Sequence, residues 1–198
     1  MRRFEILNER LFMNPMPISE VRKNLHALIL KTAYIKGKVI LSSGKESDYY
    51  IDARLLTLNA QGAYLCGRMI LDMIKDSDID AVGGPTLGAD PMVGAIGSLS
   101  FQAGQPMDTF IIRKEPKKHG KQKQVEGPIL KPGARVALID DVATTGKAFL
   151  ESLDVLEPMG IKVEKLICIV NRREGADEAL AKRGYKLTAM FDISEIHK

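Results

Sequence analysis

The sequence predicts an α/β protein built around a central, mainly parallel sheet flanked by helices. Residues 136–139 and 166–170 are continuously apolar instead of alternating, as expected of strands that are covered on both faces. Strand-like and helical patterns alternate along most of the chain. The length of 198 residues fits one domain, and 45% hydrophobic residues are enough to form its core.

The N-terminal third predicts a helix, a hairpin and a second helix. Apolar residues recur at helical spacing from Ser19, a good helix cap, until Gly37 ends the run. Short strands at 38–42 and 47–52 flank turn-forming residues and predict a hairpin. The next helix is predicted over 59–75.

The remainder alternates strands and helices. Strands are predicted at 79–83, 109–113, 135–139, 165–170 and 186–190. Helices are predicted at 90–103, 147–157 and 176–183. A long basic loop without a helix is expected at 114–131. Ligands in such sheets bind at the carboxyl ends of the strands, so the loops after Gly83, Arg113, Ile139 and Val170 are the candidates for a site.

The positive charge is concentrated in one segment. The net charge is +4, yet residues 113–123 hold six Lys or Arg side chains against one Glu. A nucleic-acid-binding surface usually spreads its charge over a face, whereas one basic loop favours a local site for a polyanion. A small molecule that carries phosphate is the predicted ligand, and no nucleic-acid partner is expected.

Neither a membrane segment nor a secretory signal is visible. The longest apolar run, 166–170, is far shorter than the roughly 18 residues that a bilayer requires. Cys66 and Cys168 are 102 positions apart in apolar segments and resemble neither a disulfide framework nor a metal site. A reducing, cytoplasmic location and no membrane partner are predicted.

The strongest pattern is the stretch 136–148, in which an apolar strand runs into two acids and then a Thr-Thr-Gly turn. Asp140 and Asp141 repel each other, so hydroxyls or positive charge are expected beside them. The turn at 144–146 offers backbone N–H groups and hydroxyls at a helix start, which suits a phosphate. An ordinary acid-capped strand–helix turn is the alternative. A Walker loop is excluded, because Ala148 stands where it needs Ser or Thr.

These residues resemble the type I phosphoribosyltransferases, whose signature is an apolar strand, two acids and a Thr-Gly turn. Within them the chain resembles the orotate phosphoribosyltransferase family, through the basic segment 113–120 and through 42–44, 50–52 and 84–90. The resemblance covers about 20–185 and implies the type I fold. It divides the single domain 19–198 into a small hood, about 19–58, and a core, about 59–198. Residues 1–18 form an N-terminal extension of unassigned role.

The resemblance also implies an activity. Orotate and 5-phospho-α-D-ribose 1-diphosphate (PRPP) would give orotidine 5′-phosphate and pyrophosphate in pyrimidine biosynthesis. Mg²⁺ is the implied cofactor, held mainly through substrate oxygens with no dedicated protein ligands. Two alternatives stay open: a phosphoribosyltransferase for a purine base, and an RNA-binding regulator of pyrimidine genes with the same fold.

Individual roles follow from the same resemblance. Catalytic roles are implied for Lys114, Asp140 and Asp141, the two acids holding the ribose hydroxyls. Residues 142–148 would hold the 5-phosphate, and Thr144 and Arg172 would contact orotate. The implied substrate-binding residues are Tyr50, Arg113, Lys117, His119, Val142, Ala143, Thr144, Thr145, Gly146, Lys147, Ala148 and Arg172.

Arg172 also has support from its own position, just beyond the apolar strand that ends at Val170, since a guanidinium can bind a planar carboxylate through two bonds. A surface arginine in a loop is the alternative. Tyr50 would lie over the base, although a lone tyrosine in a hairpin can also be a packing residue.

The basic loop is expected to close over pyrophosphate as a mobile lid. Arg113, Lys114, Lys117 and His119 would bind this leaving group. The resemblance further implies a homodimer in which Lys114 of one chain serves the neighbouring site. Two departures from the family pattern are Ser42, where some members carry lysine, and Leu87-Gly88, where some carry Tyr-Lys. At the second, backbone N–H groups of 84–88 would contact pyrophosphate instead.

Overall fold

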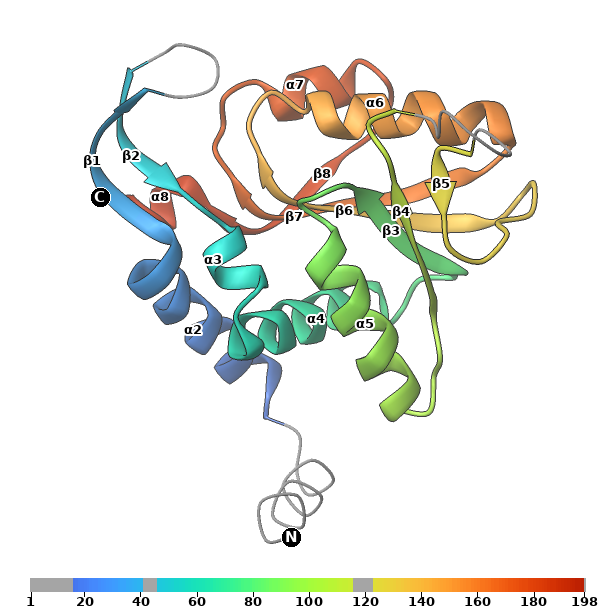
Figure 1. Cartoon of the computed structure of the whole chain (residues 1–198), viewed down its shortest axis with the longest axis horizontal. Helices are drawn as coiled ribbons and strands as arrows, with labels where there is room; N and C mark the ends of the chain where they lie inside the picture. The colour runs from blue at the N-terminus through green and yellow to red at the C-terminus, as the bar shows by residue number, and fades with distance from the viewer. Residues whose placement is uncertain (1–15, 41–45, 116–122, 198) are drawn as a thin grey trace, which may run out of the picture.

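The computed structural model describes residues 16–40, 46–115 and 123–197 (Figure 1). The strands are β1 (Tyr34–Ile40), β2 (Glu46–Ile51), β3 (Ala81–Pro85), β4 (Asp108–Ile112), β5 (Val125–Glu126), β6 (Arg135–Ala143), β7 (Lys162–Asn171) and β8 (Leu187–Asp192). The α-helices are α2 (Ile18–Leu28), α3 (Arg54–Thr57), α4 (Ala60–Ile74), α5 (Asp90–Gln102), α6 (Lys147–Leu156), α7 (Ala176–Ala181) and α8 (Ile193–Ile196). A π-helical turn, Ile29–Ala33, extends α2, and a 3₁₀ turn, Glu157–Met159, follows α6.

The main sheet has the strand order β5-β4-β3-β6-β7-β8. Every neighbouring pair is parallel except β4 and β5, which run antiparallel. The predicted α/β class with a mainly parallel sheet is therefore confirmed. A separate antiparallel pair, β1 with β2, forms the predicted hairpin.

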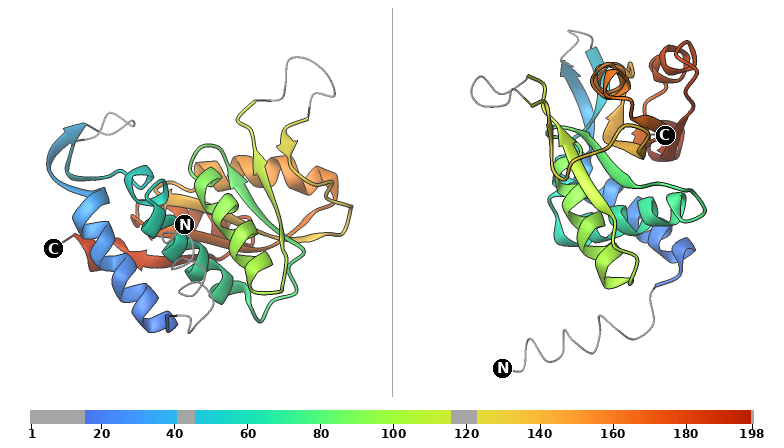
Figure 2. Two further views of the ribbon diagram at one scale, coloured as in Figure 1. Left: turned by 60° about the horizontal axis from the view of Figure 1, so that its bottom comes forward. Right: turned by 90° about the vertical axis from the view of Figure 1, so that its right-hand side faces the viewer.

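Helices cover both faces of this sheet, α6 and α7 on one side and α2, α4 and α5 on the other (Figures 1 and 2). Side chains of β6 alternate between the two resulting cores. Val136 and Leu138 pack with the α6 side, and Ala137 and Ile139 with the α4 side. Because successive side chains of a strand point to opposite faces, a strand buried twice must be continuously apolar, as this one is.

The start and the end of the first helix differ from the prediction. Pro17, not Ser19, is the N-cap, and its carbonyl accepts the N–H groups of Glu20 and Val21 at 2.9 Å each. The helical run ends at Ala33, before Gly37, because the next residues form β1 and pair with β2. Pairing between strands outweighs the local helical spacing there. The turn 41–45 lies outside the described residues.

Other elements agree with the prediction except at their boundaries. The helix predicted from residue 59 is α4, and Asn59 is its N-cap, its side chain accepting two backbone N–H groups at 3.0 and 3.1 Å. Strand β6 continues four residues past Ile139, through both acids. The expected basic loop contains β5, and α3 and α8 were not predicted. In the described ranges, no helix is both long and apolar enough to cross a membrane.

Candidate active site

Four loops meet at one edge of the sheet. Strands β3, β4, β6 and β7 are parallel, so their carboxyl ends lie at the same edge, and each is followed by a loop that the sequence marks as a candidate. The central position of β6 in this set places Asp140 and Asp141 between the loop after β3 and the turn after β7.

The two acids belong to β6 and lie at its carboxyl end. Asp140 is 8% exposed, and Asp141 is more exposed. Each carboxylate accepts the backbone N–H of the next residue: Asp141 N–H donates to Asp140 Oδ1 (2.9 Å), and Val142 N–H to Asp141 Oδ1 (2.7 Å). These short bonds fix both carboxylates against their own strand.

The environment of the acids disfavours a double negative charge. Burial, and then repulsion from Asp141, raises the pKa of Asp140 to about 8. Burial also raises the pKa of Asp141, while the Val142 N–H and the positive charge of Arg54 act in the opposite direction. A ligand that brings hydroxyl donors or positive charge would relieve this repulsion.

The loop after β3 approaches the acids at a glycine. A Cβ atom built on Gly88 would lie 2.3 Å from Asp140 Oδ1 and 2.9 Å from Asp141 Oδ1. Only glycine lets the backbone pass this close to the carboxylates. Within the described residues, no hydrogen bond uses the N–H of Leu87 or Gly88, so these two donors remain available beside the acids.

The turn after β6 forms a pocket of about 160 Å³, lined by Asp140, Val142, Ala143, Thr144, Thr145, Gly146, Lys147, Ala148 and Phe149. Gly146 makes this turn possible with a φ of 78°, and α6 begins at Lys147. The predicted phosphate-binding residues thus surround one small cavity at the positive end of a ten-residue helix.

Arg172 lies beside this turn. Its N–H donates to the carbonyl of Ala143 at 2.9 Å, so the end of β7 is tied to the end of β6. Its side chain is 7% exposed; Nη2 pairs with Glu174 Oε1 at 2.8 Å, and the guanidinium lies 4.8 Å from the ring centre of Tyr49. Nε is buried and has no hydrogen-bond partner among the described residues. A buried arginine with an unused donor suits an anionic ligand.

Tyr50 lies on the other side of the hairpin from Tyr49. Tyr49 is buried and stacks on His197 with ring centres 4.4 Å apart, whereas Tyr50 is more exposed and interacts with Arg54. Consecutive strand residues face opposite ways, so only one of the two tyrosines can support Arg172.

Arg54 and Tyr49 were missed by the sequence reasoning. Arg54 Nε pairs with Asp52 Oδ1 at 3.0 Å, and its charge acts on Asp141. The position of Arg54 directly after the predicted hairpin could have indicated a role at the site. Tyr49 could have been considered because consecutive strand residues face opposite ways, so that either Tyr49 or Tyr50 faces inward.

The basic loop leaves the sheet between β4 and β5. Arg113 N–H donates to the Gln124 carbonyl, and Gln124 Nε2 donates to the Arg113 carbonyl, both at 2.9 Å. Arg113 and Lys114 are exposed at the carboxyl end of β4, the edge that also carries the acids. Lys117 and His119 lie outside the described residues.

Comparisons with known proteins identify similar chains over almost the whole length. No protein-family model matches. Orotate phosphoribosyltransferase of Synechocystis sp. is 41% identical over 182 residues, covering 92% of this chain and 91% of that protein. The Mycobacterium tuberculosis H37Rv orotate phosphoribosyltransferase in complex with Fe(III) dicitrate has a TM-score of 0.79 at 35% identity, and its PRPP complex has 0.75 at 31%. Both alignments cover 90% of this chain and 99% of the solved one.

Proposed function

Since the chain belongs to the orotate phosphoribosyltransferase family, we propose that it joins orotate to the ribose 5-phosphate of PRPP and releases pyrophosphate. The observation that carries this proposal is the arrangement at the end of β6. A pair of acids, of which Asp140 is buried, continues into a glycine turn around a small cavity, and a buried arginine with an unused donor lies beside it. The acids would match the ribose, the glycine turn the phosphate, and the arginine a carboxylated base.

The β6 turn would bind the ribose 5-phosphate. The N–H groups and hydroxyls of 144–148 would hold the phosphate in the cavity, and Asp140 and Asp141 would accept from the ribose hydroxyls. When pyrophosphate departs, C1 of the ribose becomes positive, and two nearby carboxylates stabilise that charge. Their mutual repulsion in the free protein makes this interaction stronger in the transition state than in the resting site.

Arg172 would bind the orotate carboxylate, with Thr144 as a second polar contact. The Tyr49 ring and Glu174 hold the guanidinium in place, and the unused Nε can donate to the ligand. A charge-assisted bond in a buried site is both strong and directional. We propose that Tyr50, on the more exposed side of the hairpin, lies over the base.

The pyrophosphate leaving group would be bound from two sides. Arg113, Lys114, Lys117 and His119 supply positive charge from the basic loop, which would close as a lid and exclude water. The N–H groups of Leu87 and Gly88, which make no hydrogen bond among the described residues, would supply neutral donors. Charge on the leaving group grows as its bond to C1 breaks, so fixed cations favour the transition state.

Mg²⁺ is the proposed cofactor. The adjacent carboxylates of Asp140 and Asp141 fit a hard cation that takes most of its ligands from phosphate, ribose and water oxygens. Burial, and then repulsion from Asp141, raises the pKa of Asp140, and a nearby cation would stabilise the charged pair against both effects. The metal would supply charge neutralisation on pyrophosphate, while the protein residues bind and orient the two substrates.

We further propose a cytoplasmic homodimer that shares the lid. The π turn, β1 and α3 are adjacent and carry exposed apolar side chains: Leu30, Ile35, Leu55 and, directly after α3, Leu58. Exposed apolar side chains of this kind are commonly covered by a partner chain.

The proposed cytoplasmic location is supported by the two cysteines. Cys66 and Cys168 are both buried free thiols, which suits a reducing compartment. We keep the division into a hood, about 19–58, and a core, about 59–198, as part of this proposal.

The test of the reaction is consumption of orotate, followed by ultraviolet absorbance, in the presence of PRPP and Mg²⁺. Orotidine 5′-phosphate and pyrophosphate should form in equal amounts, and a chelator should stop the reaction. Turnover of a purine base in place of orotate would favour the purine alternative. RNA binding with steep salt dependence and no turnover would favour a regulator.

The shared lid is tested by mixing two inactive variants, Lys114→Ala and the Asp140→Asn/Asp141→Asn double variant, under conditions in which subunits exchange. If Lys114 serves the partner's site, a mixed dimer has one intact site, and activity returns to up to about half of the wild-type value. If the lid closes over its own chain, every site keeps one defect. No recovery despite demonstrated exchange would contradict the shared lid alone.

A further inference from the structure

The residue after Arg172 holds an unusual backbone conformation. Arg173 has a φ of 58°, in the left-handed region where side chains other than Asn, Asp and His are uncommon. Within the described ranges it is the one residue other than glycine with a positive φ. Gly175, two positions later, adopts a φ of 107°, so this turn readily uses glycine. The positive φ at position 173 would favour glycine, so the presence of arginine there points to a role for its side chain.

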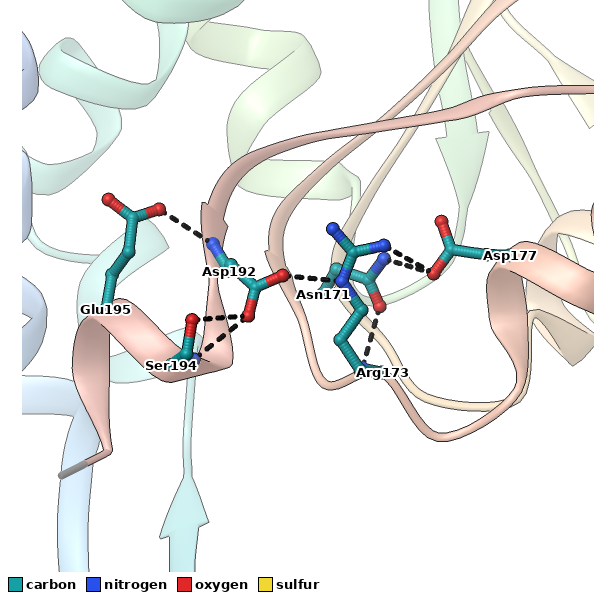
Figure 3. Close-up of polar contacts among 6 residues, drawn as sticks. All are labelled: Asn171, Arg173, Asp177, Asp192, Ser194 and Glu195. Carbon is teal, nitrogen blue, oxygen red and sulfur yellow. Dashed lines mark hydrogen bonds and ion pairs between the residues drawn. The ribbon is translucent and has the colours of Figure 1, made fainter.

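That side chain joins two acids from different elements (Figure 3). Arg173 Nε donates to Asp192 Oδ2 at 2.5 Å, and Nη1 donates to Asp177 Oδ2 at 3.0 Å. Asn171 completes a closed ring, because its Nδ2 donates to Asp177 Oδ2 (2.7 Å) and its Oδ1 accepts the backbone N–H of Arg173 (2.9 Å). The ring thus holds the backbone on both sides of Arg172.

Asp192, the far end of the bridge, is itself firmly held. It caps α8 by accepting the N–H and the hydroxyl of Ser194 at 3.0 and 2.9 Å, and Glu195 accepts the N–H of Asp192 at 2.9 Å (Figure 3). Glu195 in turn pairs with Arg22 of α2 at 2.6 Å. The Ser194 N–H and the Arg173 guanidinium lower the pKa of Asp192, so it stays ionised at neutral pH. The bridge therefore anchors the turn to β8, α8 and α2.

The bridge from Arg173 to Asp177 and Asp192 is expected to contribute little to the free energy of unfolding. The Arg173 side chain is 55% exposed, and exposed ion pairs contribute little to folding. Its neighbour Arg172, by contrast, is buried at the site, where the proposed contact with the base carboxylate requires a defined direction of the guanidinium. Small errors in the direction of such a guanidinium weaken a paired contact strongly.

We propose that Arg173 is a positioning residue, which aims the guanidinium of Arg172 at the carboxylated base through its bridge between Asp177 and Asp192. This inference rests on the proposed function, because it assumes that Arg172 binds orotate. Arg173 itself contacts no substrate. Its effect is expected on the KM for the base and not on the KM for PRPP, which the proposed function assigns to the turn after β6.

The test is the Arg173→Gly variant, since glycine accepts the same φ and removes only the bridge. The KM for orotate should rise about tenfold, while kcat and the KM for PRPP stay within about twofold. Asp192→Asn, which keeps a cap for α8, should act in the same direction. If both act through one bridge, the double variant should be no worse than Arg173→Gly.

Arg183→Gly is the matched control, because Arg183 also joins two acids, Asp154 at 2.9 Å and Glu157 at 2.6 Å, but lies on α7's C-terminal side. It should leave both KM values unchanged. An unchanged KM for orotate in Arg173→Gly, an equal rise for both substrates, or additive effects in the double variant would overturn the inference while wild-type turnover stands. If the wild-type chain does not use orotate, the proposed function fails and the inference falls with it.

Discussion

Gly88 and Asp140 lie so close that a methyl group on Gly88 would overlap the Asp140 carboxylate, with 2.3 Å between the added Cβ and Oδ1. The loop after β3 and the acids of β6 are therefore a single unit. Any side chain at position 88 would clash with the two carboxylates in their present positions.

Gly88→Ala should lower kcat/KM by about a hundredfold or more, because the added methyl would displace the Asp140 carboxylate, which we propose binds the ribose. Gly94→Ala in α5 is the matched control, since a Cβ there meets nothing within 4 Å. It should leave activity unchanged and raise the free energy of unfolding by roughly 0.5–1 kcal/mol. Steady-state kinetics and denaturant titration of both variants measure this. Equal kinetics for the two variants would contradict the close packing of Gly88.

Asp140→Asn/Asp141→Asn should abolish turnover and leave the fold intact. The two carboxylates repel each other in the free protein, so they contribute more to the positive transition state than to stability. Far-ultraviolet circular dichroism should be unchanged, and kcat should fall by at least about a thousandfold. Near-normal turnover of the folded double variant would refute the role of the acids.

Asp140→Asn alone should change how stability depends on pH. Burial raises the pKa of Asp140 to about 8, above that of the unfolded chain, so the folded state favours the neutral acid. Its contribution to stability is present below about pH 4 and is lost as the pH rises through about 8. Asparagine stays neutral, so the variant should be about 1–3 kcal/mol more stable than wild type at pH 8.5, and little changed at pH 4. Urea titrations of both proteins at pH 4 and pH 8.5 measure this difference. If the variant loses as much stability as wild type when the pH rises, the raised pKa of Asp140 is contradicted.

Arg172→Ala should raise the KM for orotate about tenfold to a hundredfold, with a much smaller effect on the KM for PRPP. Loss of one charge-assisted contact costs roughly 1.5–3 kcal/mol. Initial rates with each substrate varied in turn separate the two constants. Arg183→Ala, at the other two-acid bridge, serves as the control. Equal rises for both substrates would mean that Arg172 is structural.

The sequence predicts well those features that depend on one local pattern. A strand buried on both faces must be continuously apolar, so β6 and β7 could be recognised, and apolar spacing located the start of α4 near Asn59. Asp140 and the glycine turn are close in sequence, so the pocket that they line together could be predicted from the spacing.

Features that depend on tertiary contacts could not be predicted in this way. The helix after Pro17 ends at Ala33 because β1 pairs with β2. Tyr49 rather than Tyr50 supports Arg172, because the choice depends on which face of the hairpin turns inward. The positive φ of Arg173 depends on partners 4 and 19 positions away.

The most direct measurement is the ratio of kcat/KM for orotate to that for uracil, which lacks the carboxylate, with PRPP and Mg²⁺ and the wild-type chain. Because uracil would leave the buried Nε of Arg172 without an acceptor, orotate should be preferred by at least about a hundredfold, and the Arg172→Ala variant should lose most of this preference. A wild-type chain that uses uracil as well as orotate, or that uses neither, would contradict the assignment of this site to a carboxylated pyrimidine.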